Sequence, residues 1–174
     1  MIFSGVPGTG KSSLAEHVAR QLGAVLLSKD IIEAALWRSE IGSAQKSGWA
    51  AYEVMTVLAT EQLRLGRSVV LDSVAKTKSI RATWLALAAE QGVTVRVVHC
   101  VLSDQAAHRL RVEERRRGIP GWPELSWDDV QRVSADFETW SEEHLVLDAA
   151  RPLMENAKSL TVYLASGTAS AGRP

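Results

Sequence analysis

The chain has 174 residues, in which 20 lysines and arginines balance 20 aspartates and glutamates. This length suits one domain, and the balanced charge excludes a global positive field that would gather polynucleotides or anionic lipid. The single cysteine, Cys100, excludes an intramolecular disulfide and a multi-cysteine zinc site, and its apolar neighbours favour a buried thiol. No stretch approaches the ~18 apolar residues of a membrane span, so we expect a cytoplasmic protein without a membrane partner.

Apolar runs alternate with helical periodicity along the chain, which is typical of βαβ units around a parallel sheet. Five strands are predicted, at Ile2–Ser4, Ala24–Leu27, Ser68–Leu71, Val93–Val98 and His144–Leu147. The first strand is short, so either it is minimal or a few residues are missing before Met1. We expect one domain over residues 1–165 and a disordered tail over the small, polar residues 166–174.

The segments between the strands show helical periodicity, with one apolar face each. These faces are Leu14, Ala15, Val18, Ala19 and Leu22; then Met55, Leu58, Ala59 and Leu63; then Ile80, Trp84, Leu87 and Ala88. Ser126 and Asp129 predict a capping box that opens a further helix. Its apolar face is expected to hold Val130, Val133, Phe137 and Trp140. Pro152 suits the first turn of the last helix.

A glycine-rich loop follows the first strand and precedes a helix. Its sequence, Gly5-Val-Pro-Gly-Thr-Gly-Lys-Ser, matches the phosphate-binding pattern GxxxxGK[ST]. The glycines let backbone N–H groups turn inward around phosphates, and the helix dipole adds positive potential. Lys11 is expected to reach the β- and γ-phosphates as a catalytic residue, and Ser12 to bind Mg²⁺. The loop therefore predicts ATP and Mg²⁺ as cofactors, with nucleotide contacts from Gly5, Pro7, Gly8, Thr9, Gly10, Lys11, Ser12 and Ser13.

Carboxylates follow the second and third predicted strands, whose carboxyl ends face the ligand crevice of a parallel sheet. Asp30 is predicted to bind an acceptor and to act as general base for its hydroxyl; the alternative is that Asp30 or Ser28 caps the following helix. Asp72 is predicted to hold Mg²⁺ or to bind the acceptor, the alternative being a structural strand-end carboxylate. Arg81, early in the next helix, is predicted to anchor the acceptor, unless it is an exposed helix arginine.

The segment from Arg109 to Arg117 contains five arginines and precedes a Gly/Pro loop. A mobile lid needs arginines over the charge that develops on a transferring phosphoryl group, whereas a solvated helix face would mix its charges. On a continuous helix Arg109 and Arg116 would share one side. We expect Arg109 to contact the adenine or the phosphates. Arg116, as a catalytic residue, is expected to close over the γ-phosphate with Arg115 and Arg117.

Six tryptophans are many for this length. Trp84 and Trp140 fall on apolar helix faces and are predicted to lie in the core. The other four, Trp37, Trp49, Trp122 and Trp127, lie near the predicted acceptor site or lid. They would contact an apolar or ring-bearing acceptor there, the alternative being ordinary packing.

Together these residues resemble the small ATP-binding kinases related to chloramphenicol phosphotransferase, gluconate kinase, zeta toxins and the kinase domain of polynucleotide 5′-kinases. The resemblance runs from Ile2 to about Leu164. It rests on Gly5–Ser13, Ser28–Asp30, Val69–Asp72, Arg109–Arg117 and His144–Leu153. It implies a three-layer P-loop NTPase fold of the α/β class with a five-stranded parallel sheet, helices on both faces and an Arg-rich lid. It also implies that Asp30 is the general base and that Arg151 and Pro152 lie near the adenine.

Three functions are compatible with these motifs. The leading hypothesis is a phosphotransferase that moves the γ-phosphate of ATP to a hydroxyl of a small molecule. The second is a polynucleotide 5′-hydroxyl kinase, which the zero net charge disfavours. The third is a regulatory nucleotide-binding ATPase without an acceptor. The fuller acceptor signatures of gluconate and shikimate kinases are not matched, so the acceptor and the oligomeric state stay open.

Overall fold

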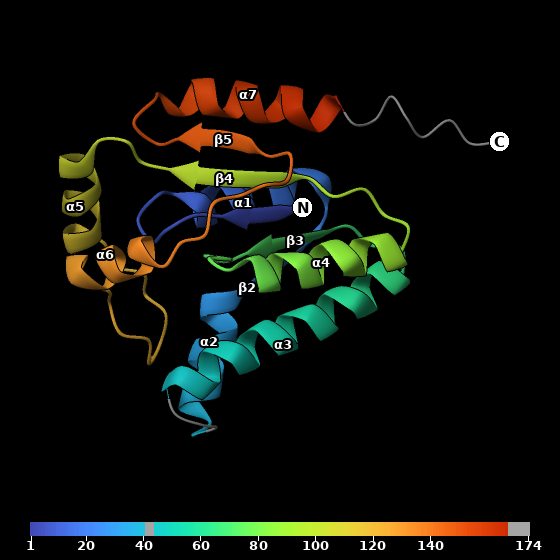
Figure 1. Ribbon diagram of the computed structural model, residues 1–174, viewed down its shortest axis with the longest axis horizontal. Helices are drawn as coiled ribbons and strands as arrows, with labels where there is room; N and C mark the ends of the chain where they lie inside the picture. Colours follow the sequence, from blue (N-terminus) through green and yellow to red (C-terminus); the bar gives the residue numbers. More distant parts are fainter. Residues whose placement is uncertain (41–43, 167–174) are drawn as a thin grey trace.

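In the computed structural model, which describes residues 1–40 and 44–166, five parallel strands form one sheet in the order β2-β3-β1-β4-β5 (Figure 1). The strands are β1 Ile2–Ser4, β2 Val25–Ser28, β3 Val69–Asp72, β4 Val97–Val101 and β5 Leu145–Asp148. All five predicted strands are present. The expected disordered tail falls on 166–174, of which all but Ser166 lies outside the described residues.

Helices cover both faces of this sheet (Figure 1). They are α1 Lys11–Leu22, α2 Lys29–Arg38, α3 Ala44–Arg64, α4 Lys78–Glu90, α5 Gln105–Glu114, α6 Trp127–Ala135 and α7 Leu153–Ala165. Helices α1 and α7 pack on one face, and α3 and α4 on the other. The pair α5 and α6 lies at the carboxyl ends of the strands (Figure 1). The predicted three-layer fold is confirmed. Among the described residues, no helix combines the length and apolar character that crossing a membrane requires.

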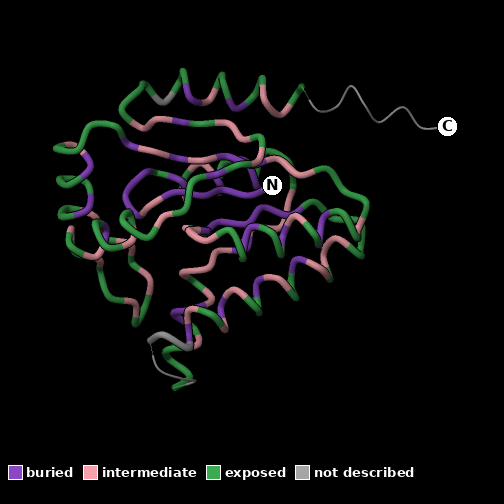
Figure 2. Tube along the Cα trace, in the orientation of Figure 1, coloured by how far each residue is buried: buried purple, intermediate pink, exposed green. Residues whose placement is uncertain are grey.

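The core consists of two layers, because successive side chains of a strand point to opposite faces. Phe3 and Val98 pack toward α1 and α7, whereas their neighbours Ile2 and Val97 pack toward α3 and α4. The central strands are accordingly buried on both sides (Figure 2). This explains why they read as continuous apolar runs in the sequence.

Strands β2, β3 and β5 each lie one residue later than predicted, and the boundaries of β4 and α6 differ further. The fourth strand starts at Val97 instead of Val93, because the Val93 N–H donates to the Ala88 carbonyl at 2.9 Å and closes the end of α4. Helix α6 opens with the expected capping box of Ser126 and Asp129.

The expectation that Phe137 and Trp140 extend the α6 face is wrong, because α6 ends at Ala135. The chain leaves the helix there, and the Glu138 N–H donates to the Lys76 carbonyl at 2.9 Å. Trp140 is nevertheless buried, and its indole N–H donates to the Ser4 hydroxyl at 3.2 Å. Phe137 and Trp140 therefore join the core from an irregular segment.

Candidate nucleotide and acceptor site

The glycine-rich loop connects β1 to α1 at the carboxyl edge of the sheet. Gly5 has φ +140°, and a Cβ there would lie 2.2 Å from the Cys100 carbonyl oxygen, so a side chain cannot fit. The Thr9 hydroxyl donates to the Val6 carbonyl at 2.9 Å and closes the loop upon itself. The backbone is thus held in a tight turn at the N-terminus of α1, where anions bind.

Lys11 and Asp72 approach each other beneath this loop. Lys11 begins α1 and is 5% exposed, and Asp72 ends β3 and is also 5% exposed. Burial raises the pKa of the Asp72 carboxyl, and the Lys11 charge and the hydroxyls of Ser12 and Ser28 oppose that rise. The Ser28 hydroxyl lies 3.4 Å from Asp72 Oδ2.

The oxygen atoms at this point fit a magnesium ion. Asp72 Oδ1 is buried and makes no hydrogen bond within the described part of the chain. This carboxylate oxygen and the Ser12 hydroxyl beside Asp72 would supply oxygen ligands of the kind that Mg²⁺ prefers. Ser12 and Asp72 are therefore suited to hold the ion with a bound nucleotide.

Asp30 lies in the first turn of α2, immediately after β2. Of the two residues considered for the helix cap, Ser28 and not Asp30 holds the N-cap position of α2, without a side-chain capping hydrogen bond. The Asp30 charge raises the pKa of Asp72, which places the two carboxylates in one electrostatic neighbourhood. Asp30 Oδ2 accepts a hydrogen bond from Arg117 Nη1 at 3.0 Å.

The arginines are arranged differently from the expected single helix face. Helix α5 ends at Glu114, and Arg115 takes an extended conformation, so the prediction that Arg109 and Arg116 share one helical side is wrong. Arg109 is exposed and pairs with Glu113 at 2.8 Å. Arg116 is also exposed, and its Nη1 bonds the carbonyls of Glu113 and Arg115.

Two other arginines lie above the phosphate loop. Arg111 and Arg115 line a hollow of about 210 Å³ whose remaining wall is Gly8, Gly10, Lys11, Ser12 and Ser13. Burial lowers the pKa of Arg115, and the charges of Asp30, Glu124 and Asp72 oppose this effect. Arg115 therefore lies within electrostatic reach of Asp30 and Asp72 and also lines the hollow over the phosphate loop. All five arginines were identified from the sequence, but the end of α5 at Glu114 was not predicted.

Residues 115–125 follow α5 within the region predicted as a lid, and this segment, called the lid loop below, packs against α2. The Arg117 side chain is 4% exposed and bonds Asp30 and Glu124. The Trp122 ring stands edge-on to Trp37, with centroids 5.3 Å apart. Arg38 Nη1 donates to the Pro120 carbonyl at 2.5 Å. These contacts close the lid loop over the residues that follow β2.

A larger hollow, of about 640 Å³, opens beside the phosphate loop between α1 and α7. Its wall includes Gly10, His17, Arg111, Arg151 and Asn156. The volume is that of an ordinary small-ligand site, roughly 300–1,000 Å³, and its position suits a base and ribose whose phosphates enter the loop. Arg151 belongs to this wall, whereas Pro152 is the N-cap of α7 and is not among the residues of the wall. His17 and Asn156 were not singled out from the sequence.

Arg81 does not reach this site. It is 0% exposed, donates from Nε to the Ala75 carbonyl at 2.7 Å and from Nη2 to the Glu138 carbonyl at 2.6 Å. Its guanidinium carbon lies 4.2 Å from the Trp140 ring centroid. The two expectations for Arg81, acceptor contact and an exposed helix position, are therefore both wrong. It ties the loop after β3 to the segment after α6.

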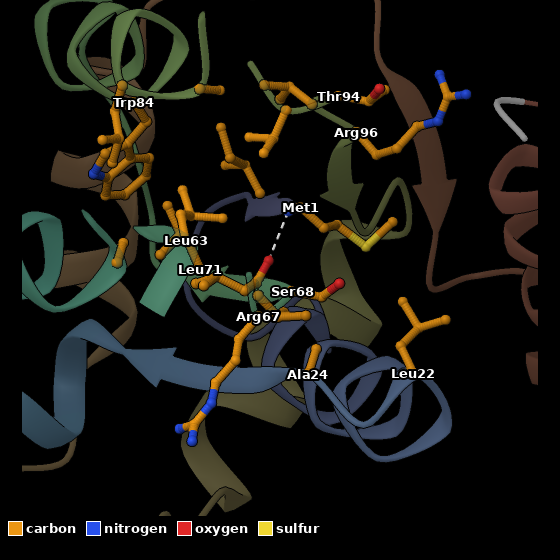
Figure 3. Close-up of a pocket in the computed structure, with 18 of the residues that line it drawn as sticks. Met1, Leu22, Ala24, Leu63, Arg67, Ser68, Leu71, Trp84, Thr94 and Arg96 are labelled. Carbon is orange, nitrogen blue, oxygen red and sulfur yellow. Dashed lines mark hydrogen bonds between the residues drawn. The ribbon is translucent and has the colours of Figure 1, made fainter. Parts of the chain in front are cut away.

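A third hollow, of about 310 Å³, lies at the opposite, amino-terminal edge of the strands (Figure 3). Apolar side chains such as Leu63, Leu71 and Trp84 supply much of its wall. The Met1 ammonium group donates to the Val69 carbonyl at 2.7 Å, and burial lowers its pKa to about 6. This hollow is separate from the phosphate loop.

The sheet, the glycine-rich loop between β1 and α1, and the buried Lys11 and Asp72 define a P-loop nucleoside triphosphatase fold. Residues 1–136 match the family described as an AAA domain, AAA_33, and the chain belongs to that family. No curated protein matches the sequence closely enough to serve as a relative.

Solved structures with the same fold include kinases. A sugar kinase from Janibacter sp. has a TM-score of 0.70 at 19% identity, and the match covers 99% of this chain and 97% of that one. The APS kinase CysC of Mycobacterium tuberculosis, in complex with AMPPNP and APS, gives 0.65 at 21% identity, covering 94% and 96%. Kti12 of Chaetomium thermophilum, in complex with ADP-AlF3, gives 0.71 at 19% identity, covering 98% of each chain. At these identities the likeness establishes the fold.

Proposed function

We propose that this protein is a P-loop kinase that transfers the γ-phosphate of Mg-ATP to a hydroxyl group of a small molecule. The observation that carries the proposal is the position of Asp30. Asp30 lies in the first turn of α2, immediately after β2, and its charge acts on Asp72, beside Ser12, and on Arg115, which lines the hollow over the phosphate loop. A carboxylate at that point can take the proton of an attacking hydroxyl.

In the reaction, the acceptor oxygen forms a bond to the γ-phosphorus while the bond to the β–γ bridging oxygen breaks. The hydroxyl proton passes to Asp30, and the products are a phosphate ester and ADP. Backbone N–H groups of the loop and Lys11 hold the phosphates, while Arg111 and Arg115 balance charge that develops on the transferring group. A magnesium ion, held through Ser12 and Asp72, would neutralise part of the phosphate charge.

The surroundings of Asp30 favour a small acceptor. The lid loop lies across α2 through Trp122 and Pro120, so a polymer chain would have to displace these contacts to reach Asp30. Glu33 of α2 is 5% exposed and accepts a hydrogen bond from the Ser47 hydroxyl of α3 at 3.2 Å. Buried polar groups beside aromatic rings are typical of sites for small polar molecules. The sugar kinase and APS kinase of the same fold take small acceptors by their names, which agrees with this choice.

A metabolite screen tests the proposal. The protein is incubated with Mg-ATP and pooled hydroxyl compounds, and mass spectrometry searches for the gain of one phosphoryl group. Lys11→Ala serves as the matched inactive control, because no neutral side chain replaces the charge-assisted phosphate contact. Consumption of ATP at the same rate with and without every pool would contradict a kinase.

Once an acceptor is found, Asp30→Asn examines the base. The amide has nearly the same shape but cannot take the proton, so transfer should fall by about 10²- to 10⁴-fold, with ATP affinity nearly unchanged. The melting temperature checks folding. Transfer at the wild-type rate by Asp30→Asn would remove the general-base role.

A nucleotide-dependent regulator without an acceptor is the second candidate. The observation in its favour is the likeness to Kti12, which is not named as a kinase and was solved with ADP-AlF3. This function predicts slow ATP hydrolysis that no small hydroxyl compound accelerates, so the same screen separates the two candidates.

A further inference from the structure

His108 links helix α5 to the phosphate loop. It belongs to α5, is 7% exposed, and its Nε2 lies 2.7 Å from the carbonyl oxygen of Pro7. Because a carbonyl oxygen can only accept, Nε2 must carry the hydrogen in this contact. On the other side, the imidazole stands edge-on to the Trp127 ring of α6, with centroids 5.1 Å apart. The ring is thus fixed between α6 and the loop.

The contact determines the orientation of one peptide group of the loop. No cis peptide bond occurs in the described residues, and in a trans peptide the C=O and the following N–H point in opposite directions. With the Pro7 carbonyl held toward His108, the Gly8 N–H must point away from His108. Gly8 lines the hollow that Lys11 and Arg115 also line, and His108 is not among the residues of that wall.

Packing between α5 and Gly8 is tight. Gly8 has φ +90°, and a Cβ there would lie 2.7 Å from Val112 Cγ2 and 2.9 Å from the His108 ring. Glycine permits several orientations of its peptide groups at little cost, so the loop backbone alone does not fix this one. Helix α5 supplies a partner from outside the loop that fixes the orientation of this peptide group.

We propose that His108 is a positioning residue for the nucleotide phosphates. By holding the Pro7 carbonyl outward, its Nε2–H presents the Gly8 N–H to the phosphate. Because His108 shares α5 with Arg111, and Arg115 follows at its end, the same contact couples the lid arginines to the shape of the loop. The inference rests on the proposed nucleotide site and does not depend on the acceptor.

Calorimetric titration with ADP tests this role, using two substitutions of His108. His108→Phe keeps a ring against Trp127 but has no donor, and ADP affinity should fall by about 2- to 12-fold, the effect of one hydrogen bond. His108→Gln places an amide N–H near the original Nε2 and should recover most of the affinity. His144→Phe is the matched control, since the nearest polar partner of His144 is the Glu142 carbonyl.

Three results would overturn the proposal. These are wild-type ADP affinity in His108→Phe, no recovery in a folded His108→Gln, and an equal loss of affinity in His144→Phe.

Imidazole ¹⁵N chemical shifts of the wild-type protein show which ring nitrogen of His108 carries the hydrogen, and this measurement does not depend on the folding of any variant. Hydrogen on Nε2 supports the contact, and a neutral ring with hydrogen only on Nδ1 excludes it. A wild-type protein that binds no ADP would refute the nucleotide site itself, whereas failure of the acceptor screen would leave the ADP titration intact.

Discussion

Neutralising Arg115 and Arg116 one at a time tests which arginine acts on the transferring phosphoryl group. The two residues are adjacent, and the same change to alanine removes the same charge. Arg115 is half-buried and lines the hollow above Lys11 and Ser12, whereas Arg116 is exposed and bonds carbonyls of its own turn. The structure therefore predicts opposite outcomes for neighbouring positions.

The magnitude follows from where each charge lies. Two unit charges about 4 Å apart, at an effective dielectric constant of about 20, attract each other by about 4 kcal/mol. An attraction of this size in the transition state corresponds to about 10³-fold in rate. The cost of fixing the side chain lowers this, so we expect Arg115→Ala to reduce kcat by about 10²- to 10³-fold. An exposed charge contributes at most about 1 kcal/mol, so Arg116→Ala should lose no more than about 5-fold.

Initial rates of acceptor phosphorylation at saturating ATP give kcat for each variant, and ADP titration gives nucleotide affinity. If Arg115 acts on charge that forms during transfer, its loss lowers kcat more than it weakens ADP binding. Equal effects of the two substitutions, or a larger loss from Arg116→Ala, would refute the reasoning and return the catalytic role to Arg116.

Two further predictions concern stability. Arg81→Met should lower the free energy of unfolding by about 3–5 kcal/mol in urea titration, because it leaves buried carbonyls without their charged donor. A folded Arg81→Met variant that keeps full stability but loses acceptor affinity would contradict the structural role of Arg81. The second prediction concerns His99, whose pKa is lowered from 6.5 to about 4 by burial, together with the charges of His144 and Arg81. The unfolded chain therefore binds the proton more tightly, so stability is complete above pH 6.5 and falls as the pH drops toward 4. The loss should be about 1–3 kcal/mol. His99→Phe should flatten this part of the curve, and an unchanged curve would contradict it.

The phosphate loop and the strands of the sheet were predictable from the amino-acid sequence alone. Consecutive backbone N–H groups form the anion cradle, so Gly5 to Ser12 carry their chemistry in a contiguous stretch that the pattern reveals. The strands are buried on both faces, so they read as apolar runs, and the parallel order places Asp30 and Asp72 at one edge.

Which side chains meet at that edge depends on long-range packing, which the sequence pattern does not reveal. Whether Arg115 or Arg116 faces the loop depends on α5 ending at Glu114, and no capping signal in the sequence marks that end. The Asp30–Arg117 ion pair joins residues 87 positions apart, so local periodicity carries no information about it. The sequence places Arg81 on a helix, but its hydrogen-bond acceptors are the carbonyls of Ala75 and Glu138, which belong to irregular segments that pack around it in the fold. Direction and burial of a long side chain are set by packing partners distant in the chain, whereas a backbone cradle is set by its own residues.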